Sequence, residues 1–290
     1  MTTRKKLALG VALGAPLGVA PAFAAPVIVT LNPSAAGLSS QGPFDATNYS
    51  LSDFARATIA PSGSFTQSGT LQLNTFLNGS TTLEAATTGL RNGTGSASYG
   101  LYITFTATGQ LSGFNPAAPT TPVSGSFTNV NYQLIGNPGN TDTINSSTFG
   151  LNQSGSNVVL ATGGLAGTPP NSVSILSSGV PAADVLLSLA QQGAGTSFFQ
   201  APPNVNLQED AFVNNTAVAT FSASDGNIIL DINGGGGNGT FIVTTPSPPP
   251  PPPGPPPPPP PPAVPEPATL ALLGTGLLGL GLLRRGRKSS

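Results

Sequence analysis

The chain has 290 residues, of which 38% are hydrophobic and only 7% are charged. It contains no Cys, His or Trp, which excludes a disulfide framework, a thiol nucleophile and the commonest general base and metal ligand. Between Ala25 and Ala263 there are nine acidic residues, two basic ones and no Lys, so the clustered cations that nucleic-acid binding needs are missing.

The first 24 residues have the three parts of a secretory signal peptide. Residues 4–6 (Arg-Lys-Lys) form a basic region, residues 7–19 form an apolar region, and Ala22 and Ala24 supply the small residues of a cleavage site. The alternative is an uncleaved anchor, which is disfavoured because the apolar region is short and rich in Gly and Pro. We predict that signal peptidase cleaves after Ala24, so that the mature chain begins at Ala25.

The next part of the chain, residues 25–245, carries repeated strand patterns. In residues 64–73, 98–111 and 126–135, apolar residues alternate with Thr, Gln or Asn, which is typical of half-buried strands. Shorter segments are rich in β-branched residues and bounded by Gly, Asn or Pro: residues 157–161, 172–176, 217–222, 227–232 and 240–244. These patterns predict one all-β domain, an antiparallel β-sandwich or a barrel-like fold.

Three local features complete the expectation for this domain. Asp225-Gly226-Asn227 between two apolar runs predicts a tight hairpin turn, because Asp and Gly tolerate positive φ angles. Residues 182–192 follow a Pro and precede a Gly, which favours a helix. Residues 234–237 are four consecutive glycines, which we interpret as a flexible turn.

Carboxylates are the remaining resource for catalysis or metal binding in this domain. A glycosidase needs two facing carboxylates, and the neighbours Glu209 and Asp210 would point to opposite faces of a strand. Oxygen ligands for Ca²⁺ occur at Asp225, Asn227, Asp231 and Asn233, but their spacing does not fit the helix-loop-helix calcium pattern. We favour roles for these residues in turns and at strand edges, and predict no catalytic residue, no metal site and no cofactor.

Residues 246–263 form a proline-rich linker. Polyproline adopts an extended helix of about 3.1 Å per residue, so residues 246–262 would reach roughly 50 Å. A docking ligand for an SH3-like or WW-like groove is the alternative, but flanking basic residues are missing. We predict a stiff stalk.

The segment 264–290 has three parts. It begins with a short motif made of Val264, Pro265, Glu266 and Pro267. The apolar run 268–283 follows without a charge. It ends in a basic cluster made of Arg284, Arg285, Arg287 and Lys288. Because basic residues are retained on the cytoplasmic side, this order predicts a membrane helix with the folded domain outside and the tail inside.

The three-part tail resembles the PEP-CTERM sorting signal of Gram-negative bacteria, with Pro265, Glu266 and Pro267 as the motif. The resemblance implies recognition by an exosortase, a membrane transpeptidase-like enzyme that cleaves near the motif and releases or re-attaches the protein at the cell surface. Residues 99–107 (YGLYITFTA) are also faintly similar to flocculation-associated PEP-CTERM proteins.

A permanent anchor is the alternative reading of the same tail. Sixteen helical residues at about 1.5 Å each span roughly 24 Å, which is short of a hydrocarbon core of roughly 30 Å. Four glycines weaken the helix further. A short, glycine-rich helix suits an inner-membrane intermediate that is later processed.

Two function classes follow from these predictions. The first is a non-catalytic protein of the cell surface or extracellular matrix, acting in biofilm, exopolysaccharide or flocculation and contacting extracellular polysaccharide. The second is a glycan-binding module or a carboxylate-dependent glycan hydrolase. We prefer the first, because the absence of Trp leaves a poor platform for stacking on sugars.

Overall fold

The computed structural model describes residues 26–90, 98–166, 171–177, 179–202, 206–212 and 219–242. Contacts between Cα atoms divide the chain into residues 1–245 and 246–290. All described residues belong to the first unit. The second unit, with the predicted linker and sorting tail, lies outside them, so the predicted domain bounds remain predictions.

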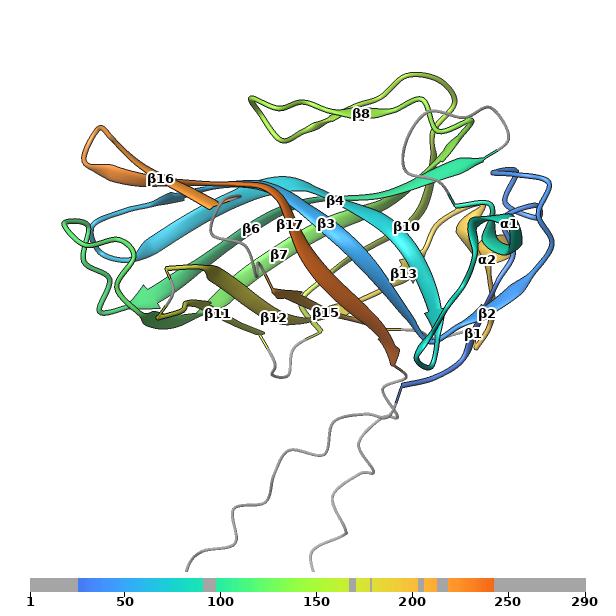
Figure 1. Cartoon of the computed structure of the whole chain (residues 1–290), viewed down its shortest axis with the longest axis horizontal. Helices are drawn as coiled ribbons and strands as arrows, with labels where there is room; N and C mark the ends of the chain where they lie inside the picture. Colours follow the sequence, from blue (N-terminus) through green and yellow to red (C-terminus); the bar gives the residue numbers. More distant parts are fainter. Residues whose placement is uncertain are drawn as a thin grey trace, which may run out of the picture. The chain divides into compact units, whose positions relative to one another are not determined.

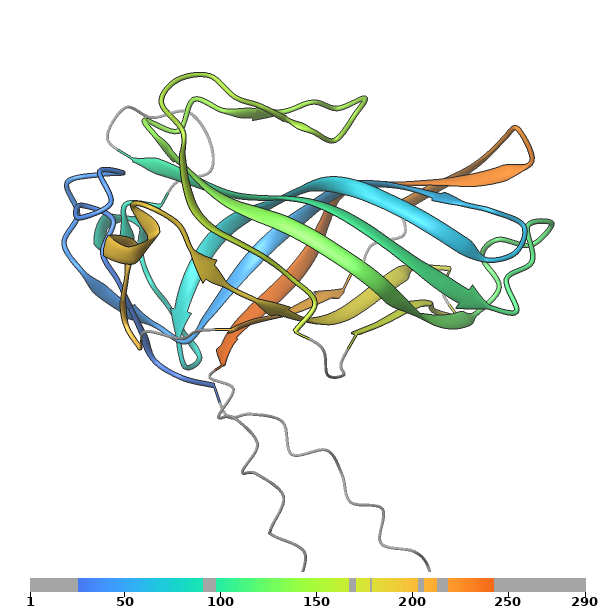
Figure 2. The same ribbon diagram turned by 180° about the vertical axis from the view of Figure 1, so that it is seen from behind.

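The described unit is built around a closed antiparallel sheet (Figures 1 and 2). Neighbouring strands pair in the ring order β11 (Asn171–Ile175), β12 (Pro181–Ser188), β15 (Asn206–Phe212), β17 (Asn227–Ile242), β3 (Asn48–Ile59), β4 (Ser64–Asn78), β6 (Tyr99–Ser112) and β7 (Val123–Pro138). The ring closes because the first residues of β7, Val123 to Ser126, also pair with β11. In Figure 1, β17, β3 and β4 lie above β11, β12 and β15. The predicted all-β antiparallel fold is confirmed.

Shorter elements extend this ring. Further strands of the same sheet are β5 (Thr81–Thr82), β10 (Val158–Gly164), β13 (Ala190–Gln191) and β16 (Ala219–Ser224). A separate sheet joins β1 (Val29–Leu31), β2 (Phe44–Ala46) and β14 (Phe199–Ala201), and a small hairpin joins β8 (Thr143–Ile144) and β9 (Leu151–Asn152). The helices of the described residues are single turns, α1 (Ala85–Thr88) and α2 (Gly195–Phe198).

Strand β3 shows how the sequence sets the inside of the ring. Its residues alternate between buried and accessible positions, and the buried row contains Tyr49, Leu51, Asp53, Ala55, Ala57 and Ile59. This alternation is the period-two pattern of a strand with one face in the core. We did not predict β3, because an acidic residue in the buried row interrupts its apolar alternation.

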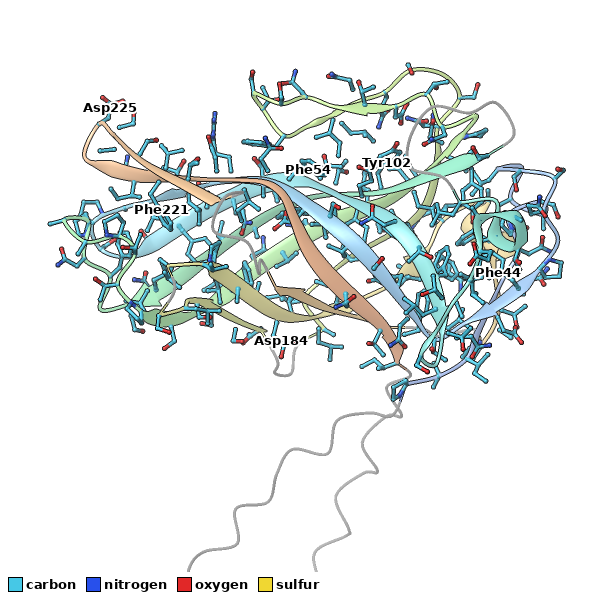
Figure 3. All side chains as sticks on the ribbon, viewed as in Figure 1. Phe44, Phe54, Tyr102, Asp184, Phe221 and Asp225 are labelled. Atoms are coloured by element: carbon cyan, nitrogen blue, oxygen red, sulfur yellow. The ribbon has the colours of Figure 1, made fainter. Side chains whose placement is uncertain are left out.

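The predicted hairpin turn is confirmed. Ser224 of β16 pairs with Asn227 of β17, and Asp225 and Gly226 between them have φ angles of 49° and 80°. Two positive φ angles match the right-handed twist of the flanking strands. Asp225 therefore lies at the tip of this hairpin (Figure 3).

The predicted helix at residues 182–192 is wrong, because the segment forms β12 and β13. Val185 and Leu187 line the interior of the ring, while Leu186 on the other face is also buried. Burial on both faces places apolar residues at consecutive positions, whose period cannot distinguish a strand from a helix. The segment forms a strand because it pairs with β11 on one side and with β15 on the other.

The predicted flexible turn at residues 234–237 is also wrong. These glycines lie inside β17, which unites the predicted strands 227–232 and 240–244. Gly234, with a φ angle of 82°, forms a bulge in the pairing with β3. Farther along the strand, a Cβ atom on Gly239 would lie 1.9 Å from the aromatic ring of Tyr49. The tyrosine side chain therefore requires glycine at position 239. The glycines are thus part of the sheet.

Among the described residues, no helix has the length and apolar character needed to cross a bilayer. The predicted membrane helix at 268–283 falls outside these residues.

Candidate functional sites

The site residues predicted from the sequence all lie outside the described residues. They are the cleavage residues Ala22, Ala24 and Ala25, the motif residues Val264, Pro265, Glu266 and Pro267, and the basic residues Arg284, Arg285, Arg287 and Lys288. The described residues offer other candidate sites, in three places on and inside the closed sheet.

The first place is the outer surface of β3, where Arg56 forms an ion pair with Asp231 of β17. Its Nε and Nη2 atoms donate to the two carboxylate oxygens at 2.6 and 2.7 Å. The hydrogen bond that Arg56 donates to Asp231 raises the pKa of Arg56. The guanidinium also lies 5.6 Å from the centre of the Phe149 ring, a cation–π distance. Asp231, one of the candidate calcium ligands, therefore forms an ion pair with Arg56.

Phe149 belongs to a long loop that contains β8 and β9 and lies over the sheet (Figure 1). The Thr70 hydroxyl on β4 donates to the Phe149 carbonyl oxygen at 2.8 Å, and both residues are buried. Asp142 holds the base of this loop, because its carboxylate accepts hydrogen bonds from Asn137 Nδ2 at 3.0 Å, Ser154 N at 2.7 Å and Asn157 Nδ2 at 2.6 Å. This carboxylate is structural.

Replacing Asp142 with Ala should loosen this loop, since three donors lose their acceptor. The expected cost is about 1–3 kcal/mol, because hydrogen bonds to a charged group are lost and Asn137 is buried. Amide exchange across residues 140–157 and urea unfolding would measure it. Asp45→Ala is a matched control, because Asp45 is exposed and accepts one side-chain hydrogen bond, from Thr30 at 2.7 Å. Equal protection of the loop in both variants would contradict the anchoring role.

Sheet register brings together two carboxylate residues that are distant in sequence. Asp184 of β12 is the direct partner of Asp210 of β15, which in turn pairs with Asn238 of β17. The adjacent residue Glu209 pairs with Val185 and Gly239 instead. Among the described residues, no three His, Cys, Asp or Glu side chains are grouped as metal ligands would be. Sequence spacing alone gave no sign of the Asp184–Asp210 register pair.

The second place, which we call the outer polar face, covers the outer surface of β4, β6 and β7 beside Arg56. Its residues stand in cross-strand rows, with Thr66 beside Thr108 and Asn129, Ser68 beside Thr106 and Asn131, and Thr104 beside Gln133. Neighbouring strands lie about 4.7–4.9 Å apart, so the rows are regularly spaced. Two open hollows of about 360 and 540 Å³ lie along this face and share Thr106.

The outer polar face has free hydrogen-bonding capacity. Thr66, Ser68 and Thr106 are exposed, and within the described part of the protein their hydroxyl groups make no hydrogen bond. The alternation of Thr, Ser and Asn in the sequence signalled half-buried strands. That the polar halves of β4, β6 and β7 join in one face follows from their register.

The third place is the interior of the ring, where two cavities of about 50 and 60 Å³ meet at Asp53, Gln67 and Ala183. Asp53 is only 4% exposed, and its Oδ1 atom has no hydrogen-bond partner. Burial raises the pKa of Asp53 to about 7. A carboxyl group without a partner in an apolar interior is costly, and perturbed groups of this kind are frequent at functional sites.

Comparison with known proteins bears on the tail. The model of the PEP-CTERM protein-sorting motif matches residues 263–288, as predicted. No curated protein and no solved structure matches the chain. The motif indicates an exported protein that is targeted by an exosortase and passes through a membrane-anchored intermediate.

Proposed function

We propose that the protein is a non-catalytic component of the bacterial cell surface or extracellular matrix, and that its outer polar face contacts extracellular polysaccharide. The sorting motif supports the destination, because an exosortase substrate is exported. The rows of hydroxyl and amide groups on β4, β6 and β7, in which the Thr66, Ser68 and Thr106 hydroxyls make no hydrogen bond with the described residues, carry the proposed contact. The role belongs to biofilm, exopolysaccharide or flocculation.

Regular hydroxyl rows suit a repeating sugar chain. Each hydrogen bond formed in water contributes about 0.5–1.5 kcal/mol, so a single contact is weak and several parallel contacts are needed. The open hollows let a chain lie across more than one row. Binding of this kind is multivalent and tolerates variation in the sugar sequence.

Removing three hydroxyls from this face should weaken binding to the host's exopolysaccharide by about tenfold or more, since about 0.5–1.5 kcal/mol is lost at each. The triple variant Thr66→Val, Ser68→Ala and Thr106→Val removes the hydroxyl groups and keeps side chains of similar size. Its matched control removes three exposed hydroxyls from β16: Thr220→Val, Ser222→Ala and Ser224→Ala. Affinity electrophoresis of the exported protein through gels containing the polysaccharide measures the effect. Equal retardation of both variants would refute the role of the face.

A hydrolase is the second candidate, and the register pair Asp184–Asp210 favours it. Directly opposite residues in an antiparallel pair have Cβ atoms about 4.5–5.5 Å apart, so the register places two carboxylate residues side by side, and a glycosidase needs two carboxylates at one site. If the protein is non-catalytic, it should release no reducing sugar from host polysaccharide. Turnover that is lost in Asp184→Asn and in Asp210→Asn would show that the protein is a hydrolase instead.

A further inference from the structure

The surface role leaves the polar group in the interior of the sheet without a function. Asp53 lies in the inward row of β3, opposite Leu71 of β4, and its Oδ1 atom is enclosed without a partner. Gln67, two residues before Gly69 on β4, lines the same two cavities. We propose that this cavity pair binds one small neutral molecule with an apolar body and a hydroxyl group.

The walls of the cavities define the apolar body. Ile59, Phe65, Leu230 and Ile232 line the first cavity, and Ile103, Phe127, Val130 and Tyr132 are among those that line the second. Closed sheets of eight strands have interiors just wide enough for side chains or for one small ligand. An apolar cavity of about 150 Å³ accommodates benzene, and the two present cavities together hold about 110 Å³, so they suit a molecule smaller than benzene.

Charge and hydrogen-bonding capacity define the polar group. Arg56 is the one Lys or Arg in the described part of the chain, and it lies on the outer surface, bound to Asp231. No described cation therefore balances Asp53 inside, which favours its protonated form. A protonated carboxyl and an amide each donate and accept hydrogen bonds, which complements a hydroxyl. An ammonium group has three donors and would need more acceptors than Asp53 and Gln67 provide.

2-Propanol and 2-chloropropane are suitable probes, because they are smaller than benzene, share shape and size and differ in the hydroxyl. Titration of the exported protein at pH 5, followed by nuclear magnetic resonance of the methyl groups lining the cavities, should show saturable shifts with 2-propanol. 2-Chloropropane should bind about fivefold more weakly, since one hydrogen bond contributes about 1 kcal/mol. In Asp53→Leu this preference should disappear.

Ala183→Leu tests the place of binding, since Ala183 lines both cavities and a larger side chain fills them. It should weaken both probes at least tenfold. Ala223→Leu is the matched control, because it makes the same change at an exposed position of β16 and should leave binding intact.

Asp53→Asn is nearly isosteric with the native residue and should retain 2-propanol binding, so it still tests the proposal if a Leu variant fails to fold. Absence of saturable shifts with 2-propanol in the native protein, or equal affinity for 2-propanol and 2-chloropropane, would overturn the proposal.

Discussion

Replacing Pro265, Glu266 and Pro267 with Ala, Gln and Ala should stop delivery of the protein to the cell surface and leave it unprocessed in the inner membrane. The motif is the part of the chain that an exosortase reads, and the matched family model covers it. Nearly all of the protein should therefore shift to the membrane fraction. Fractionation and immunoblotting of the native host measure the shift.

The folded domain should be unaffected by these changes, because the motif is predicted to follow a stiff proline-rich linker that would reach roughly 50 Å. A matched control replaces three linker prolines, Pro256, Pro257 and Pro258, with Ala. It should sort normally, and both variants should keep the circular dichroism of the native protein. Normal surface delivery of the motif variant would contradict the sorting role.

Asp53→Asn should stabilise the domain at alkaline pH by about 4 kcal/mol. Burial raises the pKa of Asp53 from 3.8 to about 7. Between these two pH values the native state binds more protons than the unfolded state, so the free energy of unfolding falls as the pH rises. Each pKa unit corresponds to about 1.36 kcal/mol, and the loss is complete above pH 7. A neutral amide removes this loss.

Urea unfolding from pH 4 to pH 8 measures the effect. The difference between the native protein and Asp53→Asn should be small at pH 4 and grow to its full value by pH 8. Asp225→Asn, at the tip of the exposed hairpin, is the control, because Asn also tolerates the positive φ angle there. It should follow the native curve. A constant difference between native protein and Asp53→Asn across this range would contradict the buried, unpaired carboxyl.

Local patterns predicted much of the sheet. The alternation in residues 64–73 and 126–135 lies within β4 and β7, the alternation in residues 98–111 begins one residue before β6, and Asp225-Gly226 makes the predicted turn. Residues 182–192 misled because burial on both faces hides the period of a strand. The closure of the ring depends on pairing between β7 and β11, about 50 residues apart, and no local pattern carries that information.

The candidate sites divide in the same way. The sorting motif is a linear sequence, so residues 264–267 and the following apolar and basic segments were sufficient to predict it. The outer polar face, the Asp184–Asp210 register pair and the Asp53 cavity all depend on which residues become neighbours across strands. Asp53 offered one local sign, since it replaces an apolar residue in the alternation from Leu51 to Ile59. Its meaning depends on β3 being a strand whose buried row contains Asp53.

We propose that this chain is exported, trimmed at both ends and delivered to the cell surface or matrix. The intact mass and location of the protein from its native host, with and without the exosortase, would test this directly. We expect a surface or extracellular species that begins at Ala25 and lacks the basic tail, and an uncleaved C-terminus in the inner membrane when the exosortase is absent. A mass starting at Met1, or the same mass and location in both strains, would contradict it.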